Sequence, residues 1–84
     1  MNSKHRKTIE AIFSSPVNGN LEWRKIESLF LGMGALKDEG QGSAVTFILN
    51  DKRADFHRPH PDKEALRYRV KAAREFLEKA GFKP

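Results

Sequence analysis

Residues 42–59 read GSAVTFILNDKRADFHRP, and this stretch decides the fold because a short polar loop joins two strand-like segments. Residues 43–49 are rich in β-branched and aromatic side chains, and residues 53–58 form a second such segment that Pro59 ends. Residues 50–52 have the composition of a hairpin loop. The stretch therefore predicts two antiparallel strands.

The two faces of this hairpin differ in polarity, because successive side chains of a strand point to opposite faces. One face gathers the apolar side chains Val45, Phe47, Leu49, Ala54 and Phe56. The other face gathers Ala44, Thr46, Ile48, Arg53, Asp55 and His57. We expect helices to cover the first face and to leave the second face open.

The pairing of the strands depends on where the loop is centred. A loop centred on residues 51–52 would place Thr46 opposite His57 and Ala44 near Pro59. A different loop would change these pairs but not the faces.

One strand and one helix are predicted before the hairpin. Residues 35–39 predict an edge strand, which a turn at residues 40–42 separates from the hairpin. Ser3 is the predicted cap of a first helix over residues 4–14. Its apolar face has the helical spacing of Ile9, Ile12 and Phe13.

Two further helices complete the predicted order. Asn20 is the predicted cap of a second helix, which Gly32 and Gly34 end; its apolar stripe is Trp23, Ile26, Leu29, Phe30 and Met33. Pro61 suits the first turn of a third helix, and Gly81 suits its end. The apolar stripe of this third helix is Leu66, Val70, Ala73, Phe76, Leu77 and Ala80.

Length and composition predict one small folded domain. The chain has 84 residues, of which 38% are hydrophobic and 32% charged, and this is enough for one hydrophobic core. We therefore predict a single α+β domain in the order α-α-β-β-β-α, with a three-stranded antiparallel sheet and the helices on one face.

The sequence has no cysteine, which excludes disulfides and thiolate chemistry. No apolar run approaches the ~18 residues of a membrane-spanning helix, and we expect a cytoplasmic protein without a membrane partner.

The charge balance favours an anionic partner. Lys and Arg number 16 against 11 Asp and Glu, and the formal net charge is +5. Such a balance attracts phosphate polyanions or acidic protein surfaces. The candidate RNA-binding residues are Arg58 at the strand end and a stripe at helical spacing, Lys63, Arg67, Lys71 and Arg74. The alternative is an ordinary solvated helix face, in which acidic residues are interleaved with the basic ones.

His57 is the candidate catalytic residue, because an imidazole exchanges protons near neutral pH. Cleavage of RNA needs a base for the 2′-hydroxyl proton and an acid or a cation at the leaving oxygen, and neither role needs a metal. The alternative is an exposed or half-buried histidine without a catalytic task. A metal site made of His57 and His60 with Asp55 or Asp62 would lack a further anchored ligand, so we predict no metal and no cofactor.

Several short motifs follow one another in the chain: Gly42-Ser43 before a strand that ends in Phe47, Pro59-His60 before the last helix, Lys63, Arg74, Phe76-Leu77 and Ala80-Gly81-Phe82. Taken in this order, they resemble the HicA family of small toxins from HicA–HicB toxin–antitoxin pairs. The resemblance implies a double-stranded-RNA-binding-domain-like fold, ribonuclease activity on messenger RNA and a HicB-like antitoxin as partner. It also divides the single domain, residues 1–84, into an αβββα core over 20–84 and a helical extension over 1–15.

One departure from the family concerns catalysis. The family's catalytic histidine follows the Gly-Ser pair, and this position is Ala44 here. The catalytic role has then either moved to His57, which the alternation places on the same face, or been lost. Three functions remain open: a metal-independent endoribonuclease (an mRNA interferase), a noncatalytic RNA-binding module, and a protein-interaction domain.

Overall fold

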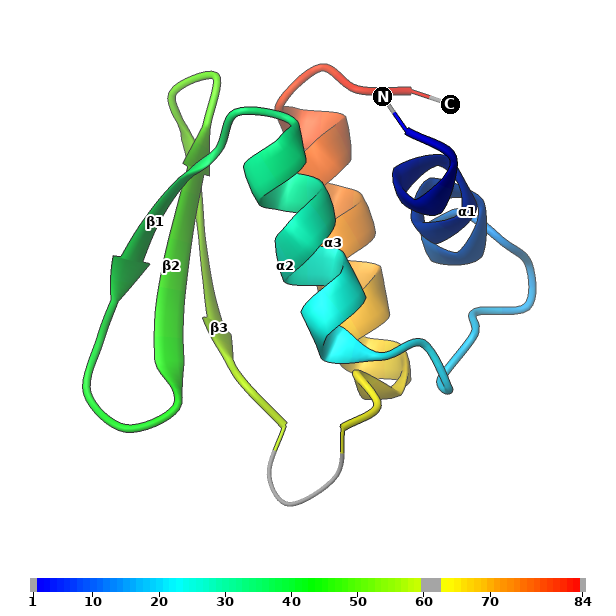
Figure 1. The fold of residues 1–84 in the computed structure, drawn as a ribbon, viewed down its shortest axis with the longest axis horizontal. Coiled ribbons are helices and arrows are strands. Elements are labelled where there is room, and N and C mark those ends of the chain that lie inside the picture. Colours follow the sequence, from blue (N-terminus) through cyan, green and yellow to red (C-terminus); the bar gives the residue numbers. More distant parts are fainter. Residues whose placement is uncertain (1, 60–62, 84) are drawn as a thin grey trace.

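The three strands form one antiparallel sheet, and the helices lie on a single side of it (Figure 1). The computed structural model describes residues 2–59 and 63–83. Its elements, in chain order, are α1 (Ser3–Ile12), α2 (Trp23–Gly32), β1 (Leu36–Glu39), β2 (Ala44–Leu49), β3 (Lys52–His57) and α3 (Leu66–Lys79). The predicted α+β class and the order of elements are confirmed. In the described part of the chain, no helix has the length and apolarity needed to span a membrane.

The molecule has three layers, because α2 and α3 lie between the sheet and α1 (Figure 1). Phe30 of α2 is fully buried, and its ring centroid lies 5.1 Å from that of Phe47 on β2 and 5.0 Å from that of Phe76 on α3. The ring centroid of Trp23, at the start of α2, lies 5.0 Å from that of Phe56 on β3. Each such aromatic pair adds about 0.5–1.5 kcal/mol beyond the area that it buries. The sheet and two helices therefore share one aromatic core.

The two faces of the hairpin are those that the alternation predicted. The apolar face is buried except for Ala54, which is half-buried at the edge of the core. On the other face His57, Asp55 and Arg53 are exposed, and Ala44 is half-buried. No helix covers this second face, which we call the open face (Figure 1).

The predicted centre of the hairpin loop is wrong by one residue. Asn50 and Asp51 form a two-residue loop with φ of +51° and +65°, the left-handed conformation that matches the twist of the flanking strands. The side-chain amide of Asn50 also donates to the carbonyl oxygen of Ala80 at 2.8 Å. The left-handed backbone angles favour the shorter loop, and the hydrogen bond attaches it to the end of α3.

The corrected loop changes the pairs across the hairpin. Thr46 lies opposite Asp55 and not opposite His57. Ala44 lies opposite His57 and not near Pro59. Because each pairing shifts by an even number of residues, the faces are unchanged.

The predicted helix caps are also corrected. Asn2, and not Ser3, caps α1, because its side-chain oxygen accepts a hydrogen bond from the amide of His5 at 2.8 Å. Asn20 does not cap α2, which begins after Glu22. The backbone amide of Asn20 instead donates to the side chain of Asn18 at 2.8 Å, within the turn that precedes α2.

The third helix begins at Leu66, later than predicted, because the preceding residues pair with the segment that leads into α2. The amide of Trp23 donates to the carbonyl of Lys63 at 2.9 Å, and the amide of Ala65 donates to that of Leu21 at 2.7 Å. These two bonds flank an isolated antiparallel β-bridge between Glu22 and Glu64, which a helix over residues 63–65 could not form. The predicted positions of His60 and Pro61 lie outside the described residues.

Candidate functional site

The open face brings Ala44 and His57 together at one end of the sheet. The backbone amide of Ala44 donates to Gln41 at 3.1 Å, and its carbonyl accepts from Gly40 at 2.9 Å, so both groups point away from β3. Ala44 and His57 therefore form a non-hydrogen-bonded pair, the kind in which Cα atoms lie about 4.5 Å apart and side chains lie closest. A Cβ on Gly40 would lie only 2.9 Å from that of Ala44, so a glycine is what fits beside this pair.

His57 itself is exposed, and its backbone is fixed by α3. The guanidinium Nε of Arg69 donates to the carbonyl oxygen of His57 at 2.6 Å. Within the described residues, the imidazole takes part in no hydrogen bond and is free to meet a ligand. Arg69 could not be predicted from the sequence as a neighbour of His57, because only the packing of α3 against β3 brings the two residues together.

In the middle of the open face, the carboxylate of Asp55 accepts hydrogen bonds from two neighbouring side chains. The hydroxyl of Thr46 donates to the carboxylate of Asp55 at 2.5 Å, and Nε of Arg53 donates to the same oxygen at 3.3 Å. The hydrogen bond from Thr46, and then the nearby Arg53, lower the pKa of Asp55 below its ordinary value. Asp55 is therefore a carboxylate at neutral pH and not a proton donor.

The rest of the open face is apolar and acidic, not basic. Leu36 on β1 lies opposite Ile48 on β2, and both are exposed, Leu36 by 68%. Asp38 lies opposite Thr46 in the row that contains Asp55. A basic surface for phosphates must therefore lie at the end or the sides of the sheet, outside this central region.

Arg58, which follows His57, is bound by two carboxylates of the protein. Its guanidinium donates to Glu27 of α2 at 2.6 and 3.1 Å and to Glu39 of β1 at 2.6 and 3.1 Å. The Trp23 indole also donates to Glu27. These bonds raise the pKa of Arg58 above its ordinary value, and they lower that of Glu39. Arg58 thus joins β3, α2 and β1, and four of its five N–H donors are in use.

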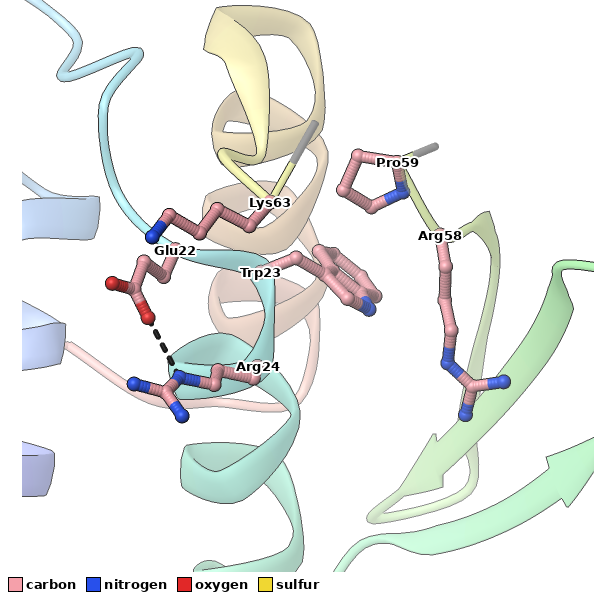
Figure 2. A pocket seen from close by; sticks show the side chains of 6 residues that line it. All are labelled: Glu22, Trp23, Arg24, Arg58, Pro59 and Lys63. Atoms are coloured by element: carbon pink, nitrogen blue, oxygen red, sulfur yellow. Dashed lines mark hydrogen bonds and ion pairs between the residues drawn. The ribbon is translucent and has the colours of Figure 1, made fainter. Parts of the chain in front are cut away.

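A cleft of about 370 Å³ lies beside the end of β3. Figure 2 shows Glu22, Arg24 and Lys63 on one side of this cleft and Arg58 and Pro59 on the other, with Trp23 between them. Nε of Arg24 donates to Glu22 at 2.6 Å, which lowers the pKa of Glu22. Lys63 is exposed at the rim. The cleft therefore offers positive charge close to the chain segment that carries His57.

The predicted basic stripe is divided into two parts. Lys63 precedes α3, and Arg67 and Lys71 are exposed on the helix. Arg74 is half-buried; it donates to the carbonyl oxygen of Ile12 at 2.9 and 2.7 Å and to that of Ser14 at 2.8 Å. Arg74 therefore binds the end of α1, and only the first three residues present their charges to solvent.

The described residues include no group of three or more His, Asp or Glu that could hold a metal ion. His60 and Asp62, which the sequence analysis considered as ligands, lie outside these residues. The chemistry that the described open face offers is that of one imidazole, an ionised aspartate and nearby cations.

The fold and this site define a small basic α+β domain. In the chain, the three strands of the sheet follow α2 and precede α3. A model of the HicA toxin of bacterial toxin–antitoxin systems matches residues 23–82, from the start of α2 to just beyond α3. The chain therefore belongs to the HicA toxin family. α1 lies outside the matched residues. Comparisons with curated proteins and with solved structures found no match.

Proposed function

We propose that this HicA-family toxin binds RNA and cleaves messenger RNA as a metal-independent endoribonuclease, with His57 as the proton-transfer group. The observation that supports this proposal is the cross-strand pairing of Ala44 with His57. The family resemblance places the catalytic histidine at position 44, and the imidazole of this chain belongs to the direct cross-strand neighbour of that position on the same exposed face. A histidine one strand away can then serve a substrate bound in nearly the same place.

The chemistry of this proposal is a transfer within the RNA strand. His57 takes the proton of a 2′-hydroxyl, and the 2′-oxygen forms a bond to phosphorus as the bond to the 5′-oxygen breaks. The 5′-oxygen takes up a proton from solvent water as it leaves, and the products are a 2′,3′-cyclic phosphate and a free 5′-hydroxyl. Arg69, which is held against the backbone of His57, supplies positive charge for the phosphate in the transition state. No step needs a metal.

RNA binding is proposed to use three exposed cations, namely Lys63 in the cleft beside the end of β3, and Arg67 and Lys71 on α3. Arg58 and Arg74 are given supporting roles, because their guanidinium groups already bind Glu27 and Glu39 or the end of α1. A noncatalytic RNA-binding toxin is the second candidate function, and the alanine at position 44 is the observation that favours it.

The test compares His57→Ala with Ala44→His, using purified protein, single-stranded RNA and a chelator. If His57 transfers the proton, His57→Ala lowers cleavage by roughly 10²- to 10⁴-fold, the usual effect of removing such a group, while the melting temperature and RNA binding are retained. If the toxin is inactive, the wild type does not cleave, Ala44→His restores cleavage, and His57→Ala changes nothing. Cleavage that requires added metal would contradict both versions.

The partner is proposed to be a HicB-like antitoxin that covers the open face, because covering His57 is a direct way to neutralise the toxin. Leu36 and Ile48 give this face the exposed apolar area that a protein interface needs at its centre. The site of action is proposed to be the cytoplasm, where messenger RNA is translated.

A further inference from the structure

A groove of about 670 Å³ lies between α1 and α2, on the side of α2 that faces away from the sheet (Figure 1). The two helices are joined across it by a hydrogen bond of 3.1 Å between Nε2 of His5 and the hydroxyl of Ser28. α1 contributes one wall, and α1 lies outside the part of the chain that the family model matches. We call this feature the α1–α2 groove.

The α1–α2 groove is strongly basic. Four of its lining residues are cations, and none of its lining residues is acidic; the cations are Lys4, Lys7, Arg24 and Lys25. All four side chains are exposed, so they can meet a ligand without opening the fold. Glu22 offsets part of the charge of Arg24 through their ion pair at 2.6 Å, but it does not line the groove. The local charge therefore fits a polyanion.

The lining favours phosphates over an acidic protein segment. Lysine ammonium groups are compact point charges that bind phosphates, and the His5 and Ser28 side chains add hydrogen-bonding groups. Protein partners bind most strongly through aromatic or large apolar anchors that enter a matching pocket. The lining includes no aromatic residue, and its one large apolar residue, Leu21, is buried.

The position of the groove connects it to the candidate site. Arg24 lines both the α1–α2 groove and the cleft that contains Lys63 and Arg58. Arg58 follows His57 directly, so the cleft adjoins the end of β3. A strand whose phosphates lie in the groove can thus continue past Arg24 into the cleft and reach Arg58 and Pro59, the residues that follow His57.

We propose that the α1–α2 groove binds the phosphate backbone of the RNA strand, so that α1 extends the binding surface beyond the family domain. This proposal rests on the RNA binding proposed above. It assigns to Lys4 and Lys7, at i and i+3 on α1, contacts with phosphates at a distance from the site of cleavage.

The experiment measures binding of a fluorescent single-stranded 2′-O-methyl RNA, which lacks the 2′-hydroxyl that cleavage requires, over a range of salt concentrations. The test variant is Lys4→Ala with Lys7→Ala, and alanine preserves the helix propensity of α1. The matched control is Lys52→Ala with Lys79→Ala, which removes the same charge from two exposed residues that do not line the groove. Both variants keep a formal net charge of +3, that is +5 minus 2.

We expect the test variant to lose roughly 10- to 100-fold in affinity at low salt and its salt slope to fall by about 1.4, since each single-strand phosphate contact contributes about 0.7. The control should bind nearly as the wild type does. Equal losses in both variants, or no loss in either, would overturn the assignment of the groove while RNA binding stands. A wild type that does not bind RNA would overturn both proposals. Binding of poly-glutamate in preference to RNA, lost in the test variant, would assign the groove to an acidic protein partner instead.

Discussion

Arg58, which lies between His57 and Pro59, joins three elements of the fold. Its guanidinium pairs with Glu27 on α2 and with Glu39 on β1. The Glu27 side chain is only 13% exposed, so its charge is poorly hydrated without this partner. The position of the strand end that carries His57 is therefore set by an ion pair and not by apolar packing alone.

We predict that Arg58→Met lowers the free energy of unfolding at neutral pH by about 1–3 kcal/mol, because it leaves the half-buried carboxylate of Glu27 without its charged partner. Arg53→Met is the control, since its ion pair with Asp55 is 68% and 65% exposed. The control should change the free energy by less than about 0.5 kcal/mol. Chemical denaturation measures both values, and equal effects would show that Arg58 has no special role.

The effect of Arg58→Met should also depend on pH. Arg58 lowers the pKa of Glu39 from its ordinary 4.5, so this carboxylate stabilises the fold fully above that unfolded value. The contribution is lost as the pH falls through the lower folded pKa. The difference in stability between wild type and variant should therefore shrink in acid, and a difference that stays constant would contradict this linkage.

The sequence identified the residue types of the site but not all of their partners. His57 and Ala44 were placed on one face by alternation alone, and this was correct. Arg58 and Arg74 were predicted as phosphate ligands, and in the fold their donors also bind groups far away in the chain. The partners lie 19 and 31 residues away for Arg58, and 60 and 62 residues away for Arg74. A guanidinium looks the same in a sequence whether it faces solvent or a carboxylate, because the difference arises from tertiary contacts.

At the scale of elements, α3 binds the C-terminal end of α1. α1 has no basic residue in its last turn, and Arg74 of α3 supplies the positive charge at this end by binding the carbonyls of Ile12 and Ser14. The guanidinium also lies 5.8 Å from the ring centroid of Phe13. One side chain thus serves as the C-terminal cap of a different helix.

We predict that Arg74→Met destabilises the end of α1 more than the rest of the molecule. The carbonyls of Ile12 and Ser14 lose their donors, at a cost of about 1–3 kcal/mol. Hydrogen exchange should quicken for the amides near the end of α1 and change little in the sheet. Lys71→Met, an exposed residue on the same helix, is the control. A uniform change over all elements would contradict a local capping role.

The helices and strands could be predicted from the spacing of apolar residues in the sequence, but the residues at which they begin and end could not. The stripes at Trp23–Met33 and Leu66–Ala80 identified α2 and α3, because burial of one face is what makes a short helix stable. The start of α3 was wrong because residues 63–65 pair with the chain before α2, and no local signal encodes that bridge. The loop centre was wrong because Asn50 and Asp51 both accept left-handed backbone angles.

At the scale of the whole molecule, the helices occupy one side of the sheet and leave the other side uncovered. The α1–α2 groove and the open face therefore lie on different sides of the protein (Figure 1). A partner that covers the open face need not cover α1.

We predict that a HicB-like antitoxin buries the open face, with a total interface on the order of 1,600 Å². The chain has no cysteine, so Ile48→Cys creates a single thiol on this face. Alkylation of that thiol should be fast in the free toxin and strongly slowed in the complex. Lys7→Cys, in the α1–α2 groove, should remain reactive in both. A thiol at position 48 that reacts equally fast in the complex would contradict direct occlusion.

β1 forms an outer edge of the sheet, and its composition affects how the free protein behaves at high concentration. An edge strand offers unpaired backbone groups to other copies, and Leu36 adds exposed apolar surface there. The strand is only four residues long, and Lys37, Asp38 and Glu39 follow Leu36. Short edge strands with charged side chains oppose pairing between the sheets of two molecules. The length and the charges of β1 therefore disfavour aggregation of the free toxin through this edge.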